Sequence, residues 1–338
     1  VLAKTTGYHG RYSHFSTYCL IQKIKETKPD VIHLHNIHGW YLNWGMLFNY
    51  LEKANIPVVW TLHDCWAFTG HCPHFMAVGC EKWKNGCFEC PLHKAYPGCF
   101  IDDSKKQFAF KKKCFTGIPN LTIVTPSLWL SDLVKESYLK EYQTIVINNG
   151  IDLNKFRPRN SDFRKRYKIE NKTIILGVAF DWSFRKGIDE FKKLAKDLPQ
   201  EYAIVLVGIS KTVARDLPKR IISIECTQNQ EELAEIYSTA DLFVNPTKED
   251  NFPTVNLESL ACGTPVVTYR TGGSPESLTQ ECGKVVPYKD YEALRDAIIQ
   301  MKDAKKSMEK TCIYQAQKFN LDDAYKKYLR LYQHCMKD

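Results

Sequence analysis

The stretch that decides the fold is Lys248-Glu-Asp-Asn-Phe-Pro-Thr-Val-Asn-Leu-Glu-Ser-Leu-Ala-Cys-Gly-Thr-Pro-Val-Val267. Residues 250–253 begin with Asp-Asn and end in proline, which predicts a short loop. Residues 254–262 then predict a short helix, which Gly263 ends. The apolar run at 265–269 predicts a buried strand. A loop, a helix, a turn and a strand in this order are typical of one unit of an α/β sheet.

Two acidic residues of this stretch, Asp250 and Glu258, lie in the predicted loop and the predicted helix. In open α/β sheets, ligands bind beside the carboxyl ends of the strands, where such loops lie. The two acids therefore indicate a ligand site at the edge of a sheet. Spacing alone leaves one alternative open, an ordinary strand–helix unit in which Glu258 is a surface acid, because short motifs recur by chance.

The stretch also resembles a signature of the retaining glycosyltransferases of family four, which have the two-domain GT-B fold. That signature is Glu-x7-Glu followed by Ala-Cys-Gly-Thr-Pro-Val-Val, and residues 261–267 match its tail letter for letter. Glu258 falls on the second Glu, and Asp250, with Glu249 beside it, replaces the first. A subgroup that makes bacterial surface polysaccharides carries this variant. The resemblance implies transfer of a sugar from a nucleotide-diphosphate sugar to a glycan or lipid-linked acceptor.

Length and composition fit an enzyme of this kind. A chain of 338 residues is long for one core and natural for two domains. The 44% hydrophobic and 25% charged residues are typical of a soluble globular protein. No apolar run is long enough to span a bilayer, and no signal peptide is visible. We therefore expect a cytoplasmic enzyme.

Short β-branched runs alternate with helical patterns along the chain, which predicts βαβ units and parallel sheets. The expected strands are 30–35, 57–62, 121–125, 144–147, 173–177, 203–207, 221–224, 242–244 and 266–268. The expected helices include 12–28, 130–140, 187–197, 230–239, 290–302 and 322–335. We therefore predict an α/β protein of GT-B type, with two Rossmann-like domains whose parallel sheets face a cleft.

The expected domain boundary falls in a basic, proline-containing segment at 155–165. An N-terminal, acceptor-side domain is expected over 1–155 and a C-terminal, nucleotide-sugar-binding domain over 166–318. A last helix within 319–338 is expected to pack back toward the first domain. The chain opens in polar residues and continues directly into a helix, without a counterpart of the family's first strand and glycine loop. The first domain is therefore expected to be incomplete.

The segment Gly177-Val-Ala-Phe-Asp-Trp-Ser-Phe-Arg-Lys-Gly187 predicts the end of a strand, a loop and the start of a helix. Cations and helix N-termini attract phosphate, so Arg185 and Lys186 are candidates for binding the donor diphosphate. The family has Arg-x4-5-Lys-Gly there, and Lys186 with Gly187 matches its end. The family's earlier arginine is missing, and Arg185 would approach from another direction. The alternative is a basic pair at the start of a surface helix.

The resemblance also implies how the remaining residues would hold the donor. Asp250 would contact sugar hydroxyls, and Glu258 would accept hydrogen bonds from the ribose hydroxyls. Gly272 and Gly273 match the family's Gly-Gly-x-Pro-Glu loop, whose glycines let backbone N–H groups reach an anionic ligand. The residues expected to line the sugar pocket with backbone groups are Asn251, Phe252 and Thr254.

In the first half of the chain, Trp60-Thr-Leu-His-Asp64 ends a predicted strand. The resemblance aligns His63 with a histidine that the family uses near the transferred sugar. A neutral histidine can accept a proton near physiological pH. In enzymes of this family the leaving phosphate is the expected acceptor, so His63 is expected to position the sugar. With Lys186 and Asp250, it completes the predicted catalytic group. The nearby histidines expected in supporting or core positions are His33, His35 and His38.

Thirteen cysteines are many for a cytoplasmic enzyme, and they are densest in a loop expected over 65–99. The set with the spacing Cys-x7-Cys-x6-Cys-x2-Cys is Cys72, Cys80, Cys87 and Cys90. Four thiolates can form a closed tetrahedral zinc site, which predicts a structural Zn²⁺, and no catalytic metal is expected. Packed free thiols are the main alternative, because disulfides suit secreted proteins. The loop also resembles that of the surface-polysaccharide subgroup.

The net charge of +9 predicts acidic partners such as nucleotide phosphates, anionic lipid or nucleic acid. Residues 105–115 interleave lysines with aromatic residues. As a basic amphipathic helix, this segment would make a peripheral contact with the anionic inner face of the membrane. The ordinary alternative is a solvated helix face. No nucleic-acid-binding motif is present, so no nucleic acid is expected as a partner. The rival function is a non-catalytic sugar- or nucleic-acid-binding protein on the same scaffold.

Overall fold

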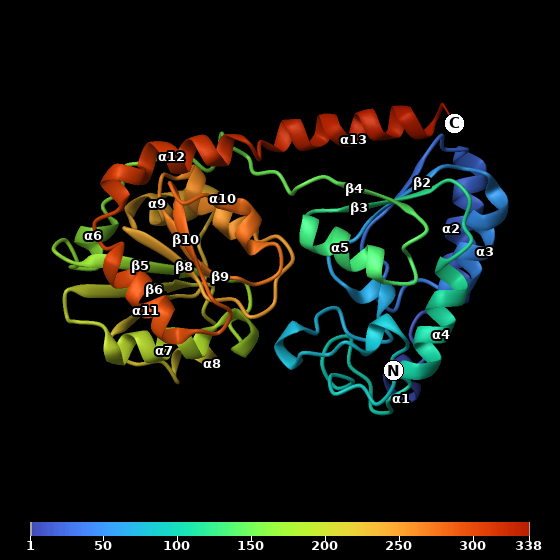
Figure 1. Ribbon diagram of the computed structural model, residues 1–338, viewed down its shortest axis with the longest axis horizontal. Helices are drawn as coiled ribbons and strands as arrows, with labels where there is room; N and C mark the ends of the chain where they lie inside the picture. The colour runs from blue at the N-terminus through green and yellow to red at the C-terminus, as the bar shows by residue number, and fades with distance from the viewer. Residues whose placement is uncertain (1, 338) are drawn as a thin grey trace. The chain divides into compact units, whose positions relative to one another are not determined.

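The computed structural model describes residues 2–337, which form two compact units (Figure 1). Unit 1 contains the residues up to Asn148 together with those from Lys326 onward, and unit 2 runs from Asn149 to Tyr325. Each unit is built on one sheet of parallel strands with helices on its faces. The predicted α/β class is thereby confirmed. Among residues 2–337, no helix is both long and apolar enough to cross a membrane.

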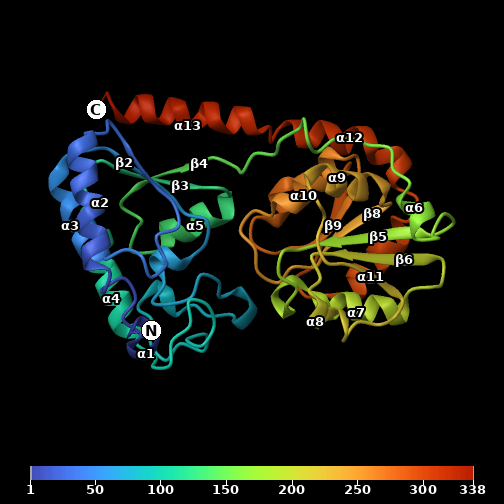
Figure 2. The ribbon, with the colours of Figure 1, turned by 180° about the vertical axis from the view of Figure 1, so that it is seen from behind.

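Unit 1 has a four-stranded parallel sheet whose strands follow one another in chain order. Its strands are β1 (Ile32–Leu34), β2 (Val58–Thr61), β3 (Leu121–Thr125) and β4 (Gln143–Val146). Its helices are α1 (Leu2–Thr6), α2 (His14–Thr27), α3 (Trp44–Ala54), α4 (Ser104–Phe115), α5 (Leu128–Glu136) and the second half of α13 (Leu321–Cys335). Figure 2 shows α2, α3 and α4 side by side.

The two faces of this sheet carry different helices, because successive strand residues point to opposite sides. Val58 and Trp60 pack into a core with residues of α3, α4 and α5. Val59 and Val124 face the other way and pack with Leu331 of α13. The end of the chain thus covers one face of the sheet of unit 1.

Between β2 and α4 the chain makes a long loop, and we call residues 65–99 the cysteine loop. Within it the structure has three short 3-10 turns and no α-helix or strand. These turns are η1 (Trp66–Phe68), η2 (Met76–Val78) and η3 (Lys82–Lys84). The loop nevertheless buries large aromatic side chains, among them Phe68 and Trp83. These side chains belong to the same buried cluster as Trp44 of α3 and Trp60 of β2, so the loop packs on the main core of unit 1.

Unit 2 has six parallel strands in the order β10-β9-β8-β5-β6-β7. They are β5 (Thr173–Val178), β6 (Tyr202–Val207), β7 (Ile221–Ile224), β8 (Leu242–Asn245), β9 (Val266–Tyr269) and β10 (Gly283–Val286). The helices and 3-10 turns are α6 (Phe163–Arg166), η4 (Phe184–Lys186), α7 (Ile188–Asp197), α8 (Lys211–Ala214), α9 (Gln230–Thr239), α10 (Thr254–Ala261), η5 (Ser274–Ser277), α11 (Tyr291–Gln300) and α12 (Lys305–Gln317).

Counted from β5, this order is the doubly wound 3-2-1-4-5-6 arrangement, in which the direction of winding reverses between β5 and β8. Figure 1 shows α9, α10 and α12 on one face of the sheet and α7 and α11 on the other, and two separate buried clusters fill these faces. The sequence patterns missed β10 and α12. The first is a short run after a Cys-Gly pair, and the second begins with charged residues that hide its buried face.

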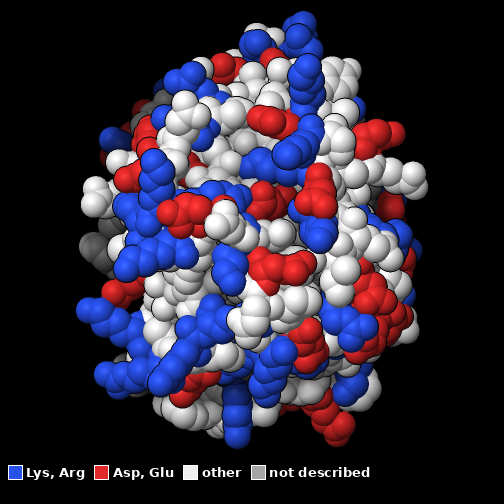
Figure 3. All heavy atoms as spheres, turned by 90° about the vertical axis from the view of Figure 1, so that its left-hand side faces the viewer, with Lys and Arg blue, Asp and Glu red and all other residues white. Residues whose placement is uncertain are grey.

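Basic and acidic side chains are interspersed on the face of unit 2 that Figure 3 shows, with lysines and arginines most frequent along its lower edge. Charges of both signs at this spacing largely offset one another beyond about 10 Å in physiological salt. The excess of positive charge in the sequence therefore does not gather into one broad basic surface on this face.

Candidate active site

Two loops of unit 2 lie at the point where the winding of its sheet reverses. One follows β5 and contains η4, and the other follows β8 and leads into α10. In doubly wound sheets, the carboxyl ends of the two strands at this point border a crevice where ligands bind. The predicted residues Lys186 and Asp250 sit on these two loops, 64 positions apart in sequence.

The structure brings Lys186 and Asp250 into direct contact. The Lys186 Nζ donates to Asp250 Oδ2 at 2.5 Å, and the two side chains are 23% and 17% exposed. The other carboxylate oxygen, Asp250 Oδ1, accepts from the Asn251 N–H at 3.0 Å. A partly desolvated cation beside a carboxylate can bind a phosphate with one group and a hydroxyl with the other.

A buried cation that the sequence analysis missed, Lys248, ties the two loops together. Its Nζ lies 2.5 Å from Asp189 Oδ2 and 3.4 Å from Glu190 Oε1, and 3.6 Å from the centre of the Phe184 ring. Its backbone N–H donates to Arg185 O at 2.8 Å. Lys248 and Glu190 are both almost fully buried, so this charge pair is screened little by water. The lysine therefore fixes the loop that carries Arg185 and Lys186.

The predicted Arg185 points to the same pair of loops, but its guanidinium contacts the backbone. The Arg185 Nη1 donates to Glu249 O at 3.3 Å. Thr247 Oγ1 donates to that same oxygen at 3.1 Å. In this structure the cation that contacts Asp250 is therefore Lys186, and Arg185 stabilises the loop that holds Asp250.

Glu258, on α10, accepts a hydrogen bond from a tyrosine that no sequence motif singles out. The Tyr237 hydroxyl on α9 donates to Glu258 Oε2 at 2.9 Å. Burial raises the pKa of Glu258, and hydrogen bonds from Tyr237 and Thr254 act in the opposite direction. Tyr237 is fully buried, so it orients the Glu258 carboxylate from the core side.

The backbone of the Gly272–Gly273 loop contacts the loop between β8 and α10, which carries Asp250. Gly273 N donates to Asn251 O at 2.8 Å, and Gly272 has φ +51°, a conformation that favours glycine. Asn251 and Phe252 are both buried, and the Phe252 ring packs against Phe319. Their side chains are turned into unit 2, and that they line a sugar pocket through backbone groups stays a prediction.

A second group of candidate residues lies in unit 1, at the carboxyl ends of β1 and β2. His63 Nε2 and His35 Nδ1 are 2.9 Å apart, so one ring donates to the other. Burial lowers the pKa of both rings, and it lowers the pKa of His33 to about 4. These imidazoles are therefore neutral at physiological pH, which suits hydrogen bonding to a sugar.

The tyrosines of α13 hold the histidine next to this pair. His33 Nδ1 lies 2.6 Å from the Tyr332 hydroxyl, and His33 Nε2 lies 2.8 Å from Thr61 Oγ1. The Tyr328 hydroxyl lies 3.1 Å from the same Thr61 oxygen. His33 thus has the supporting position that the sequence analysis expected, with α13 as its partner.

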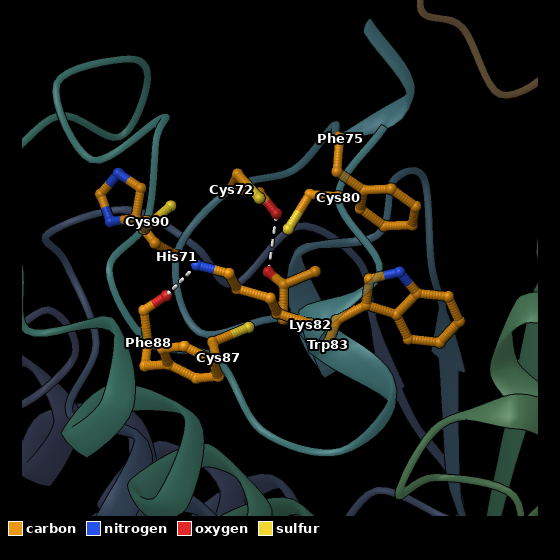
Figure 4. A pocket seen from close by; sticks show the side chains of 10 residues that line it. His71, Cys72, Phe75, Cys80, Lys82, Trp83, Cys87, Phe88 and Cys90 are labelled. Carbon is orange, nitrogen blue, oxygen red and sulfur yellow. Dashed lines mark hydrogen bonds between the residues drawn. The ribbon is translucent and has the colours of Figure 1, made fainter. Parts of the chain in front are cut away.

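The cysteine loop brings the four predicted zinc ligands to one small cavity (Figure 4). These ligands are Cys72, Cys80, Cys87 and Cys90, and all thirteen cysteines are free thiols in the structure. Among residues 2–337, one group of residues already has its possible metal-ligand atoms within 4.8 Å of one another. This group is His9, His71 and Cys99. The four predicted sulfurs do not form such a group in this structure.

Comparison with known proteins gives two family matches that together span most of the chain. The profile described as "Glycosyl transferases group 1" matches residues 159–319. The profile described as "Glycosyltransferase Family 4" matches residues 5–155. The first match contains the candidate site of unit 2, and the second contains the histidines and the cysteine loop of unit 1.

Curated relatives carry names from glycan assembly. The putative colanic acid biosynthesis glycosyl transferase WcaC of Escherichia coli is 26% identical over 76% of this chain. The N,N'-diacetylbacillosaminyl-diphospho-undecaprenol alpha-1,3-N-acetylgalactosaminyltransferase of Campylobacter jejuni is 25% identical over 62% of it. The chain spans 64% of the length of the first relative and 59% of the second.

Solved structures share the fold at low sequence identity. Sucrose-phosphate synthase of Thermosynechococcus elongatus matches with a TM-score of 0.71 and 21% identity, covering 94% of this chain and 77% of that one. HepE of Anabaena, solved in complex with UDP-glucose, matches with a TM-score of 0.67 and 15% identity, covering 94% of this chain and 82% of that one. These likenesses establish the fold.

Proposed function

The chain belongs to the glycosyltransferases of family four, and from this premise we propose that it is a retaining glycosyltransferase of cell-surface polysaccharide assembly. It would transfer a sugar from a nucleotide-diphosphate sugar to a glycan or lipid-linked acceptor. The observation that carries the proposal is the pair of Lys186 and Asp250, 2.5 Å apart at the switch point of the sheet. A cation for the leaving diphosphate and an acid for the sugar are both needed there.

Lys186 would stabilise the leaving diphosphate. As the bond between the sugar and the phosphate breaks, negative charge grows on the phosphate oxygens, and a fixed cation lowers the energy of that state. The bound phosphate would replace Asp250 as the partner of the Lys186 ammonium group. Asp250 would then be available to accept hydrogen bonds from sugar hydroxyls, so one ion pair would supply both contacts.

Glu258 would bind the ribose hydroxyls of the nucleotide. Its carboxylate already accepts from Tyr237 at 2.9 Å, which leaves acceptor capacity for other donors. Backbone N–H groups of the loop at Gly272 and Gly273 would face the anionic donor. Ribose contacts change little during the reaction, so Glu258 would act on binding rather than on rate.

His63 would position the transferred sugar from unit 1, and the pairing with His35 would keep its ring oriented. In the proposed retaining step, the bond from the sugar C1 to the phosphate oxygen breaks, and a bond to the acceptor oxygen forms on the same face. The acceptor proton passes to the departing phosphate. The neutral state of His63 suits a hydrogen bond to the sugar without a change of charge.

The relatives support the substrate class. One is named for colanic acid biosynthesis and another for transfer to a diphospho-undecaprenol-linked sugar, and a structural neighbour was solved with UDP-glucose. For a cytoplasmic enzyme working on such an acceptor, four exposed lysines of α4 would attract anionic lipid. Gln107, Lys111 and Phe115 on the same helix are buried in unit 1, so this contact would rest on charge alone. Salt-sensitive sedimentation with anionic vesicles would test it.

The proposal is tested by screening UDP-, GDP- and ADP-sugars for thermal stabilisation of the chain, followed by mass spectrometry of the products. At least one nucleotide sugar should bind, and its sugar should be transferred to an acceptor or hydrolysed slowly. Glu258→Gln should weaken binding of the free nucleoside diphosphate, and Asp250→Asn should mainly change the preference among sugars. The exposed Glu292→Gln should do neither.

Two outcomes would overturn these assignments. Binding of a sugar or nucleic acid with no turnover of any donor would favour the non-catalytic rival. If Glu258→Gln binds nucleotide like the parent while Asp250→Asn loses it, the roles of the two acids are interchanged.

A further inference from the structure

The cysteine loop plays no part in the chemistry proposed above, although it holds six of the thirteen cysteines. It buries Phe68, Phe75 and Trp83 without an α-helix or a strand of its own. Ordering a long irregular loop costs about 1–2 kcal/mol of backbone entropy per residue, which burial of these three rings against the core of unit 1 offsets only in part. A long loop without an α-helix or a strand is therefore expected to need a further cross-link for stability.

Four thiols of the loop converge on one cavity, as Figure 4 shows. The cavity measures about 10 Å³ and is walled by aromatic rings, among them Phe75, Trp83 and Phe88. That volume is about what one water molecule needs, yet the lining offers few polar partners to a water. Four soft sulfur ligands around a small dry space are the chemistry that Zn²⁺ selects.

The backbone around two of these thiols is already arranged to stabilise a thiolate. Gly70 N donates to Cys87 Sγ at 3.0 Å, and the Leu92 N–H bonds to the Cys90 sulfur. Position 70 must be glycine, because a Cβ there would lie 2.6 Å from the Cys87 Cβ and 2.5 Å from Ser104 O. Close approach of a backbone N–H to a ligand is a common use of glycine.

The turn that joins Cys87 to Cys90 is held in a strained form. Glu89 has φ +44°, which costs a non-glycine residue about 1 kcal/mol or more. The Lys82 ammonium group clamps this turn by donating to Phe88 O at 3.0 Å and to Glu89 O at 3.2 Å. The clamp keeps both sulfurs on the cavity side of the turn.

A buried lysine lies close to the thiols of the cavity. Lys111, on α4, is 1% exposed, and its Nζ donates to Trp66 O at 2.6 Å. Burial lowers the pKa of Lys111 to about 7, and the nearby Cys87, Cys72 and Asp64 act in the opposite direction. Four thiolates around Zn²⁺ carry a net negative charge, which would give this lysine a counter-charge inside the protein.

We infer that Cys72, Cys80, Cys87 and Cys90 bind one Zn²⁺, which cross-links the cysteine loop. Binding replaces four S–H bonds by four Zn–S bonds and releases four protons to solvent. The sulfurs would close on the ion from their present positions around the cavity. The loop follows His63 and Asp64 directly in sequence, so the metal would also steady the segment that carries the predicted sugar-positioning histidine.

The neighbouring group of His9, His71 and Cys99 is a weaker ligand set. Trp40 Nε1 donates to His9 Nδ1 at 3.0 Å, which puts the proton of a neutral His9 ring on Nε2. His71 Nε2 faces Ala95 O at 3.3 Å, which leaves only its Nδ1 as a ligand. A metal at this second group would therefore have to displace the proton of His9.

The first experiment measures zinc by mass spectrometry in protein purified without chelators and in protein incubated with Zn²⁺ and desalted. We expect about one equivalent per chain, lost in the Cys87→Ser/Cys90→Ser double variant. The matched control is Cys19→Ser/Cys226→Ser, which removes two exposed thiols outside the loop and should retain zinc. Cys99→Ser separates the two ligand groups and should also retain it. A zinc-free parent protein, or zinc lost with Cys99→Ser but kept without Cys87 and Cys90, would overturn the inference.

A second measurement on the unaltered protein avoids variants that fail to fold. Native alkylation, followed by peptide mass spectrometry, reports which thiols react. The four ligands should be protected until a chelator is added and should then become reactive together, while Cys19 and Cys226 react throughout. Equal labelling of all four with and without chelator would contradict the metal site.

Discussion

The two units share a parallel α/β architecture but hold their candidate residues in different ways. All ten histidines and nine of the thirteen cysteines lie in unit 1, and unit 2 has no histidine. In unit 2 the site is held by charge pairs, such as Lys186 with Asp250 and Lys248 with Glu190. In unit 1 the candidate histidines are neutral and bond to one another and to a tyrosine of α13. The same fold class therefore places one group of candidate residues through charge pairs and the other through hydrogen bonds between neutral rings.

The two units hold their candidate residues differently because the segments between their strands differ in length. The loops of unit 2 that carry Lys186 and Asp250 are short, and backbone bonds tie them to each other, as between Lys248 N and Arg185 O. The segment after β2 in unit 1 runs from 62 to 103 before the next α-helix begins. Side chains therefore supply much of the order of this segment, as where Thr69 Oγ1 donates to Cys72 O and Lys82 Nζ donates to Phe88 O.

The largest expected effect is a loss of stability of unit 1 in acid. Burial lowers the pKa of His9, His33 and His71 from 6.5 to about 4, so between these values the unfolded chain binds more protons than the folded one. Stability therefore falls as pH drops from about 6.5 toward 4. Unit 2 lacks histidine, and the raised pKa of Glu258 acts with the opposite sign.

Tryptophan fluorescence can follow this difference, because six of the seven tryptophans lie in unit 1 and Trp182 lies in unit 2. Urea unfolding of Trp182→Phe at pH 7 and pH 5, with chelator present in both, should show a clear fall in the midpoint of unit 1. Nucleotide binding by unit 2 should survive at the lower pH. An equal loss of stability in both units would show that the buried histidines do not set the acid sensitivity of unit 1.

The next effect concerns the charge pair of unit 2. Lys186→Ala should lower kcat by about 10²–10³-fold, or about 3 kcal/mol, because the charge it balances grows only in the transition state. The KM for the donor should change much less. Lys196→Ala, an exposed lysine on α7, is the matched control. Unchanged turnover in Lys186→Ala would mean that another cation, with Arg185 as the first candidate, serves the diphosphate.

The smallest expected effect tests whether unit 2 also depends on a hydrogen bond from an uncharged donor, the Tyr237 hydroxyl. Tyr237→Phe removes the donor to Glu258 and should cost about 1–2 kcal/mol of stability, because a partly buried acceptor loses its partner. The pKa of Glu258 should rise further, and nucleotide affinity should fall several-fold. Tyr314→Phe, at an exposed tyrosine, should leave both unchanged. Full affinity in Tyr237→Phe would show that charge alone orients Glu258.

The sequence alone predicted the features that depend on neighbouring residues, namely the strands and the loops that carry motif residues. Nine of the ten strands and the α/β class followed from apolar runs, and the loop positions of Lys186 and Asp250 followed from motifs. Lys248 and Tyr237 were missed because their partners are distant: Glu258 lies 21 residues beyond Tyr237, and Asp189 lies 59 residues before Lys248. Only the packed fold decides such pairs. His33 likewise meets Tyr332 across 299 residues, which no spacing rule could anticipate.

The place of α13 in the chain sets the order in which the two units can be finished on the ribosome. Val59 and Val124 need Leu331 to cover their face of the sheet, yet all of unit 2 is synthesised between them. At 5–20 residues per second, unit 2 takes roughly 10–35 s to make. For that time Leu331 is missing from its face of the sheet of unit 1. Unit 2 is continuous in sequence and has all its residues before Leu331 is added, so the unit whose synthesis begins first is completed last.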